Sequence, residues 1–213
     1  MLTLILAVAI GQQIVDCGNG SYQIQNDPRP RLTVASYLNS AREGDLILGA
    51  KDSRGLQTIF RRTTRSCITH VAMIVKKDNG DLAVLDASPG QEVRLYEIKE
   101  YLRDYRGALC VKRRVGAKPP PEMGQFVKKQ IGRPYSRLKE LAKVPFSLPI
   151  VKDITPLQRI GEEVGWFCSS LTTAAAQMGG WIDPLINPQA IRPVDMFLSE
   201  NPNWDIAQVI HRK

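Results

Sequence analysis

Residues 69–87, T-H-V-A-M-I-V-K-K-D-N-G-D-L-A-V-L-D-A, carry the clearest indication of the fold of this chain. Residues 69–75 are apolar on both faces of an extended segment, a pattern typical of a central strand rather than an edge strand. Asp78-Asn79-Gly80 is a hairpin signal, and residues 82–87 have the composition of a strand that pairs back. The stretch therefore predicts an antiparallel hairpin in the middle of a sheet.

The length of the hairpin loop determines whether His70 and Asp86 can meet. A two-residue turn at Asn79-Gly80 makes the two side chains project from opposite faces. A three-residue loop places Asp86 opposite Ala72, so that His70 and Asp86 become diagonal neighbours on one face, about 7–8 Å apart at the backbone. That loop type requires Gly80 at positive φ. A bulged loop is thus the condition under which Asp86 can orient His70.

The segments around this hairpin predict an α+β fold, because strands come first and helices mostly later, without an internal repeat. We expect a small, mostly antiparallel sheet packed against helices. Residues 12–31 are rich in Gly, Asn and Pro and predict an irregular lead-in. The expected strands are 46–48, 69–75, 82–87, 93–96, 108–114 and 206–210, and the expected helices are 32–41, 57–65, 98–105, 122–131 and 168–178.

Length and composition predict a single domain over 32–213, since 213 residues with 43% hydrophobic and 23% charged residues can bury a core. The formal net charge of +8 comes from basic residues scattered along the chain. Such an excess is either an ordinary solvated surface or an attraction to an anionic membrane or polymer. No zinc-finger, RNA-recognition or helix-turn-helix signature accompanies it, so we expect no nucleic-acid partner. The sequence does not indicate an oligomeric state.

Residues 1–11 form an apolar run that is too short to span a bilayer. One interpretation is a signal peptide with Ala9 and Gly11 before a cut near Gln12, which makes the protein exported or cell-envelope. The other is a buried first strand, which leaves the protein cytoplasmic. Residues 1–31 are accordingly a signal peptide or an irregular N-terminal lead-in.

Cys168 stands in G-W-F-C-S-S-L, residues 165–171, at the start of the helix expected over 168–178. Apolar residues recur there at helical spacing, and Gly179 is a plausible stop. A thiol in the first helical turn lies at the positive end of the helix dipole, which can lower its pKa from about 8.5 to roughly 3.5–7.5. The alternative is a small buried hydrophobe, since free cysteine is often buried.

A thiol nucleophile needs a base, and the base needs a polar group that orients it. His70 and Asp86 are the candidates for these roles, because the second histidine, His211, is expected to be frayed and exposed near the C-terminus. A zinc site is the competing interpretation of the same region. It would combine Cys67-x-x-His70 with the isolated Cys110 and Cys168. The four cysteines show no spacing typical of a disulfide framework.

Taken in order, five motifs resemble one family. They are G-D-L-I-L (44–48), T-H-V-A-M-I-V (69–75), V-L-D-A (84–87), I-G-R-P-Y (131–135) and W-F-C-S-S-L (166–171). The chain resembles the circularly permuted NlpC-like papain-fold hydrolases of the YaeF/YiiX type, which are related to poxvirus and lecithin-retinol acyltransferase-like members. In that family the histidine strand precedes the cysteine helix, and the resemblance extends from about residue 44 to about residue 195.

The resemblance implies a cysteine-dependent hydrolase that cleaves an amide or ester bond through a thioester. It implies that Cys168 is the nucleophile, that His70 is the base, and that Asp86 takes a third polar position where close relatives often have Glu. Tyr135 matches a tyrosine that helps to polarise the substrate carbonyl, although a packing aromatic is the other interpretation. A Pro-x-Asp feature, Pro193 to Asp195, is expected to be structural. No cofactor or metal is implied.

Function within the family ranges over peptidases, cell-wall amidases, lipid acyltransferases and thioesterases, and fold alone does not choose among them. The expected substrate is a peptide, a cell-wall component or a lipid acyl group. The alternative outside enzymology is a catalytically silent module that binds an anionic surface.

Overall fold

The computed structural model describes residues 14–16, 22–24, 29–50, 68–135 and 165–212 of the chain. Its main strands are β3 (Leu32–Thr33), β4 (Leu46–Ala50), β5 (Ile68–Lys76), β6 (Leu82–Asp86), β7 (Arg94–Glu97), β8 (Ala108–Lys112) and β9 (Gln208–His211). Its helices are α1 (Val34–Leu38), α3 (Ile98–Asp104), α4 (Pro121–Gln130), α7 (Cys168–Met178) and α8 (Pro193–Leu198), with a 3-10 turn η3 (Pro188–Ala190).

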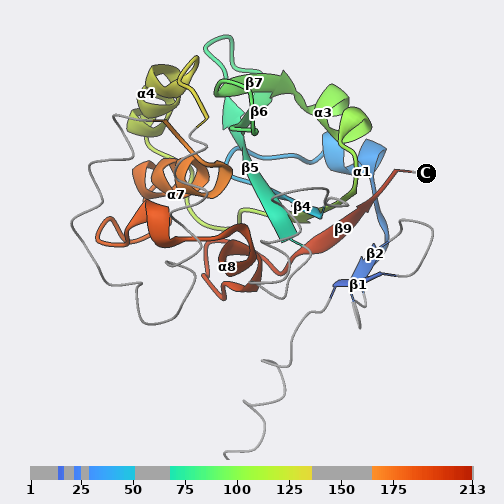
Figure 1. The fold of residues 1–213 in the computed structure, drawn as a ribbon. Helices are drawn as coiled ribbons and strands as arrows, with labels where there is room; N and C mark the ends of the chain where they lie inside the picture. The colour runs from blue at the N-terminus through green and yellow to red at the C-terminus, as the bar shows by residue number, and fades with distance from the viewer. Residues whose placement is uncertain (1–13, 17–21, 25–28, 51–67, 136–164, 213) are drawn as a thin grey trace, which may run out of the picture.

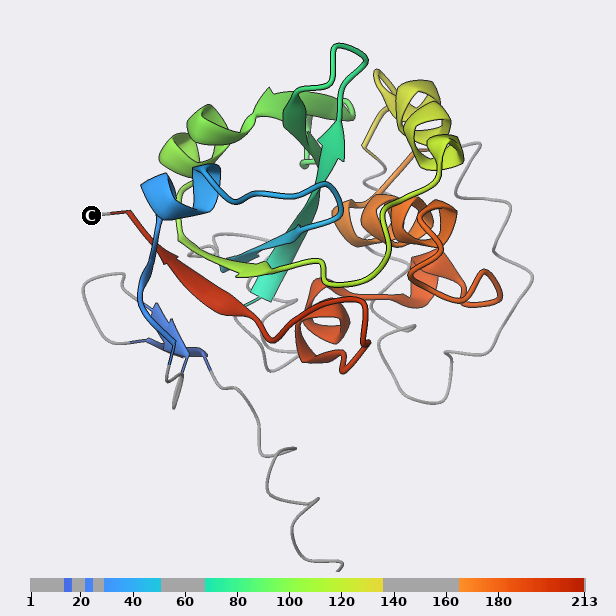
Figure 2. The same ribbon diagram turned by 180° about the vertical axis from the view of Figure 1, so that it is seen from behind.

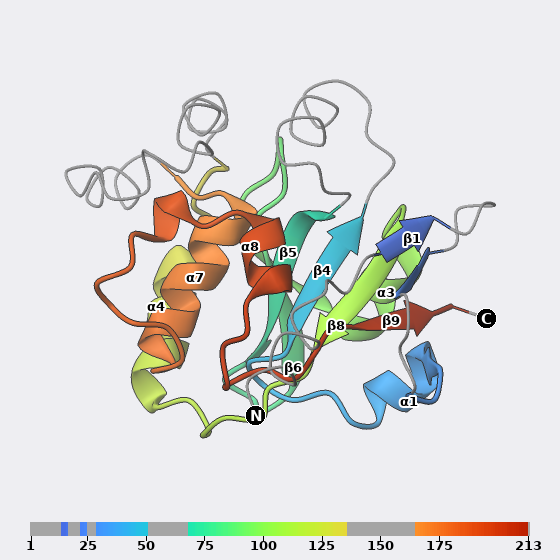
Figure 3. The same ribbon diagram turned by 90° about the horizontal axis from the view of Figure 1, so that it is seen from below.

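Seven of the described strands form one open sheet in the order β3-β9-β8-β4-β5-β6-β7 (Figure 1). All neighbouring strands are antiparallel except β3 and β9. Helices α4, α7 and α8 cover one face, and α1 and α3 lie side by side over the other (Figures 2 and 3). The predicted α+β class and mostly antiparallel sheet are therefore confirmed.

The central position of β5 explains its continuous apolar sequence. Val71, Met73 and Val75 point into the core beneath α7, and Ala72 and Ile74 point into the core beneath α1 and α3. Because successive side chains of a strand alternate between faces, a strand covered on both faces has no polar positions to spare. The prediction of a central strand over 69–75 is confirmed.

The β5–β6 hairpin has the three-residue loop that the sequence left as one of two alternatives. The backbone N–H of Lys77 donates to the Asp81 carbonyl at 2.8 Å, and Gly80 has φ +91°. The ladder pairs Met73 with Leu85, a register that puts Asp86 opposite Ala72. His70 and Asp86 consequently share a face of the sheet.

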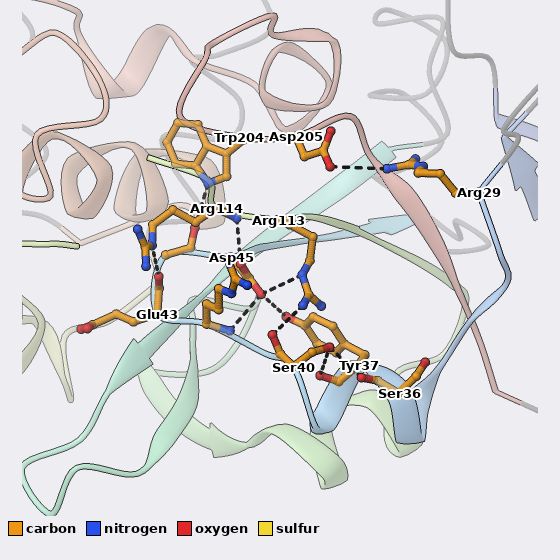
Figure 4. A network of polar contacts seen from close by, with 12 residues as sticks. Arg29, Ser36, Tyr37, Ser40, Glu43, Asp45, Arg113, Arg114, Trp204 and Asp205 are labelled. Carbon is orange, nitrogen blue, oxygen red and sulfur yellow. Dashed lines mark hydrogen bonds and ion pairs between the residues drawn. The ribbon is translucent and has the colours of Figure 1, made fainter. Parts of the chain in front are cut away.

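The turn before β4 is anchored by Gly44 and Asp45, and Figure 4 shows the contacts of Asp45. Asp45 is fully buried, and its carboxylate accepts hydrogen bonds from the backbone N–H groups of Arg114 at 2.8 Å and Arg42 at 3.0 Å. The indole of Trp204 donates to the Gly44 carbonyl at 2.8 Å. The turn thereby connects the start of β4 to the segments that follow β8 and precede β9.

Several boundary predictions are corrected near the edge of the sheet. Residues 12–31, expected to be irregular, contain an antiparallel pair, β1 (Ile14–Asp16) and β2 (Tyr22–Ile24). The helix expected over 32–41 is shorter, because Leu32 and Thr33 pair with β9 and the Thr33 hydroxyl then caps α1 by accepting from the Ser36 N–H. His211, expected to be frayed, ends β9 and pairs with Thr33.

The predictions for residues 1–11 and 57–65 lie outside the described residues. No helix among the residues that the structure describes has both the length and the apolar character that crossing a lipid bilayer requires.

Candidate active site

His70 lies where β5 begins, at an irregularity in its pairing with β4. Gly49 pairs with His70 and Ala50 pairs with Ile68, so Thr69 has no opposite residue on β4. A bulge of this kind bends the strand and re-aims the neighbouring side chains. His70 can therefore meet Tyr105 at the end of α3 on one side of the sheet and Cys168 of α7 on the other.

Asp86 holds one nitrogen of the His70 ring. His70 Nε2 lies 2.8 Å from Asp86 Oδ1, and the second carboxylate oxygen, Oδ2, accepts a hydrogen bond from the Ser88 hydroxyl at 2.8 Å. The side chain of Asp, although shorter than that of Glu, reaches the imidazole. The geometry meets the condition that the sequence set for Asp86 as the group that orients His70.

Cys168 is the first residue of α7, as predicted, and the helix runs over the predicted residues to Met178, with Gly179 as its C-cap. The side chain of Ser170 fixes the entry to the helix, since its Oγ accepts from the Phe167 N–H at 3.0 Å and donates to the Phe167 carbonyl at 3.2 Å. Both α7 and β5 begin at the same end of the molecule (Figure 3). This common end brings the cysteine to the histidine.

The Cys168 side chain lies within hydrogen-bonding reach of His70. Because Asp86 occupies Nε2, the Nδ1 atom is the ring nitrogen left to face the thiol. The three residues are nearly enclosed, with exposed fractions of 7% for Cys168, 8% for His70 and 4% for Asp86. The structure thus brings together the three residues that the sequence predicted for catalysis.

The charges at this site stabilise an imidazolium. Burial opposes it, but the carboxylate of Asp86 and then the negative charge of Cys168 raise the pKa of His70 well above its ordinary value. For Asp86, burial acts to raise the pKa, and the charge and hydrogen bond of His70, together with the Ser88 hydroxyl, lower it below its ordinary value. Each partner therefore favours the charged form of the other.

Tyr135 is held close to the start of α7 by the backbone. It forms a parallel bridge with Trp166, and its N–H donates to the Gln91 carbonyl at 3.1 Å. Its ring contacts Phe167 edge-on at a centroid distance of 5.8 Å. The half-buried tyrosine lies beside the residues that precede Cys168, and its predicted role at the substrate carbonyl stays a prediction.

The remaining residues that the sequence singled out, Asp195 and Cys110, lie away from the His70–Asp86 pair in helix α8 and strand β8. Asp195 accepts from the Arg192 N–H at 2.9 Å and forms an ion pair with the Arg192 guanidinium, which caps α8. Cys110 is buried in β8, with β4 between it and β5. Within the described ranges, no group of three or more His, Cys, Asp and Glu side chains could hold a metal ion, and Cys67 lies outside those ranges.

Sequence reasoning did not identify Ser88 or the tyrosines that surround the pair. Ser88 follows Asp86 by two residues, the spacing of a local side-chain hydrogen bond, so the sequence does carry a signal for it. The Tyr101 hydroxyl lies close enough to Asp86 to help lower the pKa of that carboxyl. Tyr105 stacks on His70 from the end of α3, and no spacing in the sequence indicates that contact.

Similarity of this chain to known proteins is found among solved structures. No family model and no curated protein matches it. A solved structure described as the metalloprotein yiiX from Escherichia coli O157:H7 aligns with 81% of this chain and 97% of its own, at 16% identity and a TM-score of 0.48.

Proposed function

We propose that the protein is a cysteine-dependent hydrolase that cleaves an amide or ester bond through a thioester acyl-enzyme. The observation that carries the proposal is the order of contacts around His70, in which Nε2 meets Asp86 at 2.8 Å while Cys168 at a helix start lies within hydrogen-bonding reach. A nucleophile, a base and an orienting group in hydrogen-bond contact are the requirements of nucleophilic catalysis.

In the proposed reaction, the Cys168 thiolate attacks the substrate carbonyl, and the electron pair of the C=O bond moves to oxygen. Collapse of this intermediate expels the amine or alcohol, which takes a proton from the His70 imidazolium and leaves a thioester on Cys168. Neutral His70 then removes a proton from water, which attacks the thioester and releases the acid. The Asp86 carboxylate holds the ring through both steps and stabilises its positive form.

The negative oxygen of the intermediate requires hydrogen-bond donors. The backbone N–H of Cys168, at the positive end of α7, is one candidate, because it belongs to the nucleophile itself and the helix dipole favours negative charge there. The Tyr135 hydroxyl is the second, since the Tyr135 backbone bridges Trp166 two residues before the nucleophile. The order of histidine strand and cysteine helix further supports a circularly permuted papain-like fold of the NlpC type.

The acyl acceptor and the substrate class extend the same proposal. A peptide, a cell-wall amide and a lipid acyl group all present the carbonyl that this mechanism needs. If an alcohol or amine replaces water in the second step, the enzyme is an acyltransferase. The net charge of +8 favours a substrate at an anionic membrane or polymer surface.

Alkylation of Cys168 by iodoacetamide tests the proposal. The full-length wild type and the His70→Gln variant are labelled between pH 5 and pH 9, and the modified cysteine is identified by peptide mass spectrometry. We expect rapid modification of Cys168 at neutral pH that falls about tenfold or more in the variant, because the imidazolium no longer stabilises the thiolate.

Asp86→Asn serves as the matched variant, since it keeps a side chain of the same size and removes the charge. Its rate of Cys168 alkylation should lie between the rates of the wild type and His70→Gln. Equal rates in all three proteins, with the pH profile of an ordinary thiol, would refute the proposal and favour a non-catalytic module that binds an anionic surface.

A further inference from the structure

An aromatic side chain covers the face of the His70 ring. Tyr105, at the C-cap of α3, stacks on the imidazole with a centroid distance of 6.1 Å and an interplanar angle of 29°. Tyr101, one helical turn earlier, lies behind it at a centroid distance of 5.9 Å. The imidazole is therefore bounded by Asp86 at one edge, by Cys168 at another and by Tyr105 on a face.

Gly49 makes the room that Tyr105 occupies. It lies on β4 directly opposite His70, and a Cβ atom at this position would overlap the Oη and Cζ atoms of Tyr105. The Tyr105 hydroxyl is buried there and has no hydrogen-bond partner among the described residues. A glycine opposite the histidine and a tyrosine over it thus form one packing unit.

The ring of Tyr105, rather than its hydroxyl, makes the specific contact. The hydroxyl has no described partner, so removing it breaks no described bond. Burial raises the pKa of Tyr105 to about 12, and the tyrosine stays neutral while His70 titrates. Among the described residues, the charges that raise the pKa of His70 are those of Asp86 on β6 and Cys168 on α7, and the nearby Tyr96 and Tyr105 are neutral.

We propose that Tyr105 is a positioning residue for His70, whose ring keeps the imidazole in the plane where Nε2 faces Asp86 and Nδ1 faces Cys168, and that Gly49 is required because it admits Tyr105. An imidazole with an open face can rotate about its side-chain bonds and lose both contacts together. The inference concerns the same site as the proposed function and rests on it for the consequence at Cys168.

Nuclear magnetic resonance of the imidazole groups tests the inference without relying on activity. The chain has two histidines, so His211 provides an internal control for His70. In the full-length wild type and in Tyr105→Phe, we expect a downfield, exchange-protected Nε2–H signal from His70. In Tyr105→Leu, this signal should broaden or disappear, and the alkylation rate of Cys168 at neutral pH should fall about tenfold, while His211 is unchanged.

The Gly49→Ala variant supplies an independent test of the packing unit. It should reproduce the effect of Tyr105→Leu because the new methyl group displaces the tyrosine, and it should add little in a Tyr105→Leu background, where the overlapping atoms are absent. Tyr37→Leu is the matched control, because Tyr37 is a buried tyrosine of α1 in the core on the same face of the sheet and is in contact with Arg113 and Asp45. It should lower the unfolding temperature and leave the His70 signal intact.

Two outcomes would overturn the inference. One is a Tyr105→Leu protein that keeps the protected Nε2–H signal and the wild-type alkylation rate. The other is loss of the signal in Tyr105→Phe, which would assign the effect to the hydroxyl. Failure of the proposed function is a separate result, in which alkylation of the wild type does not depend on His70 whatever the imidazole signals show.

Discussion

His70 and Asp86 depend on each other for their charge states. Burial alone disfavours both charged forms, and each partner offsets this penalty for the other, so that the pKa of His70 is raised and the pKa of Asp86 is lowered. The two groups influence each other through the 2.8 Å contact between His70 Nε2 and Asp86 Oδ1. Asp86 therefore controls the charge that His70 presents to Cys168.

Replacing Asp86 by Asn should lower the pKa of His70, because the charge that raises it is gone while burial, which lowers it, remains. Titration of the imidazole signals measures this change, with His211 as reference. The upper limb of the pH profile of Cys168 alkylation should move to lower pH in parallel. An unchanged His70 titration would show that Asp86 does not stabilise the imidazolium.

The Asp86→Asn substitution should also change how the free energy of unfolding depends on pH. The raised pKa of His70 contributes stability that is fully present below about pH 6.5 and is lost as the pH rises through the pKa of the folded protein. The lowered pKa of Asp86 contributes stability that is present above about pH 3.9 and is lost as the pH falls. The wild type should exceed Asp86→Asn in unfolding free energy by about 1–3 kcal/mol near pH 5, and the difference should narrow in alkaline solution. Urea denaturation of the two proteins at pH 5, 7 and 9 measures the difference in unfolding free energy and its change with pH.

Among the elements, the turn before β4 shows how a single glycine can hold a strand in place. Gly44 has φ +89°, and its N–H donates to the Ile74 carbonyl at 2.7 Å. A Cβ at this position would overlap the side chains of Trp181 and Arg114. Backbone conformation and close packing both require glycine here, and the turn sets the register of β4 against β5 and so the position of Gly49.

Gly44→Ala and Gly80→Ala separate these two requirements. Both glycines have φ near +90°, but a Cβ at Gly80 would meet only the Cε atom of Lys76 at the ordinary distance of 3.7 Å. Gly44→Ala should therefore cost about 1–3 kcal/mol more unfolding free energy than Gly80→Ala, the cost of overpacking. Chemical denaturation of the two variants provides the comparison, and equal losses would contradict the packing argument.

For the molecule as a whole, coverage of the sheet predicts the order in which its parts open. β5 lies between two neighbouring strands, β4 and β6, and is covered by helices on both faces, whereas β7 is an edge strand. Native-state hydrogen exchange should find the amides of Val71 to Val75 opening only with global unfolding, and those of β7 at lower free energy. Exchange of β5 at the rate of β7 would contradict this order.

Much of this arrangement is predictable from local patterns. Helical spacing and Gly179 located α7, and the apolar run over 69–75 located the central strand. The hairpin sequence allowed two loops, because Asn-Gly suits both, so the local sequence did not choose between them. The parallel pairing of β3 with β9 and the stacking of Tyr105 on His70 could not be predicted, since they join distant segments and neither changes the local pattern of residues.

The parallel β3–β9 pair also has a mechanical consequence. Tension applied through the chain on either side of it pulls Leu32 backward along its strand and His211 forward along its own, which loads the ladder in shear. The Arg29 guanidinium also ties the segment before β3 to the segment before β9, because it donates to the carbonyls of Ile206 and Ala207. β4, β5 and α7 all lie within the loop of chain that this edge closes. A pulling force reaches Cys168 and His70 only after the edge has given way.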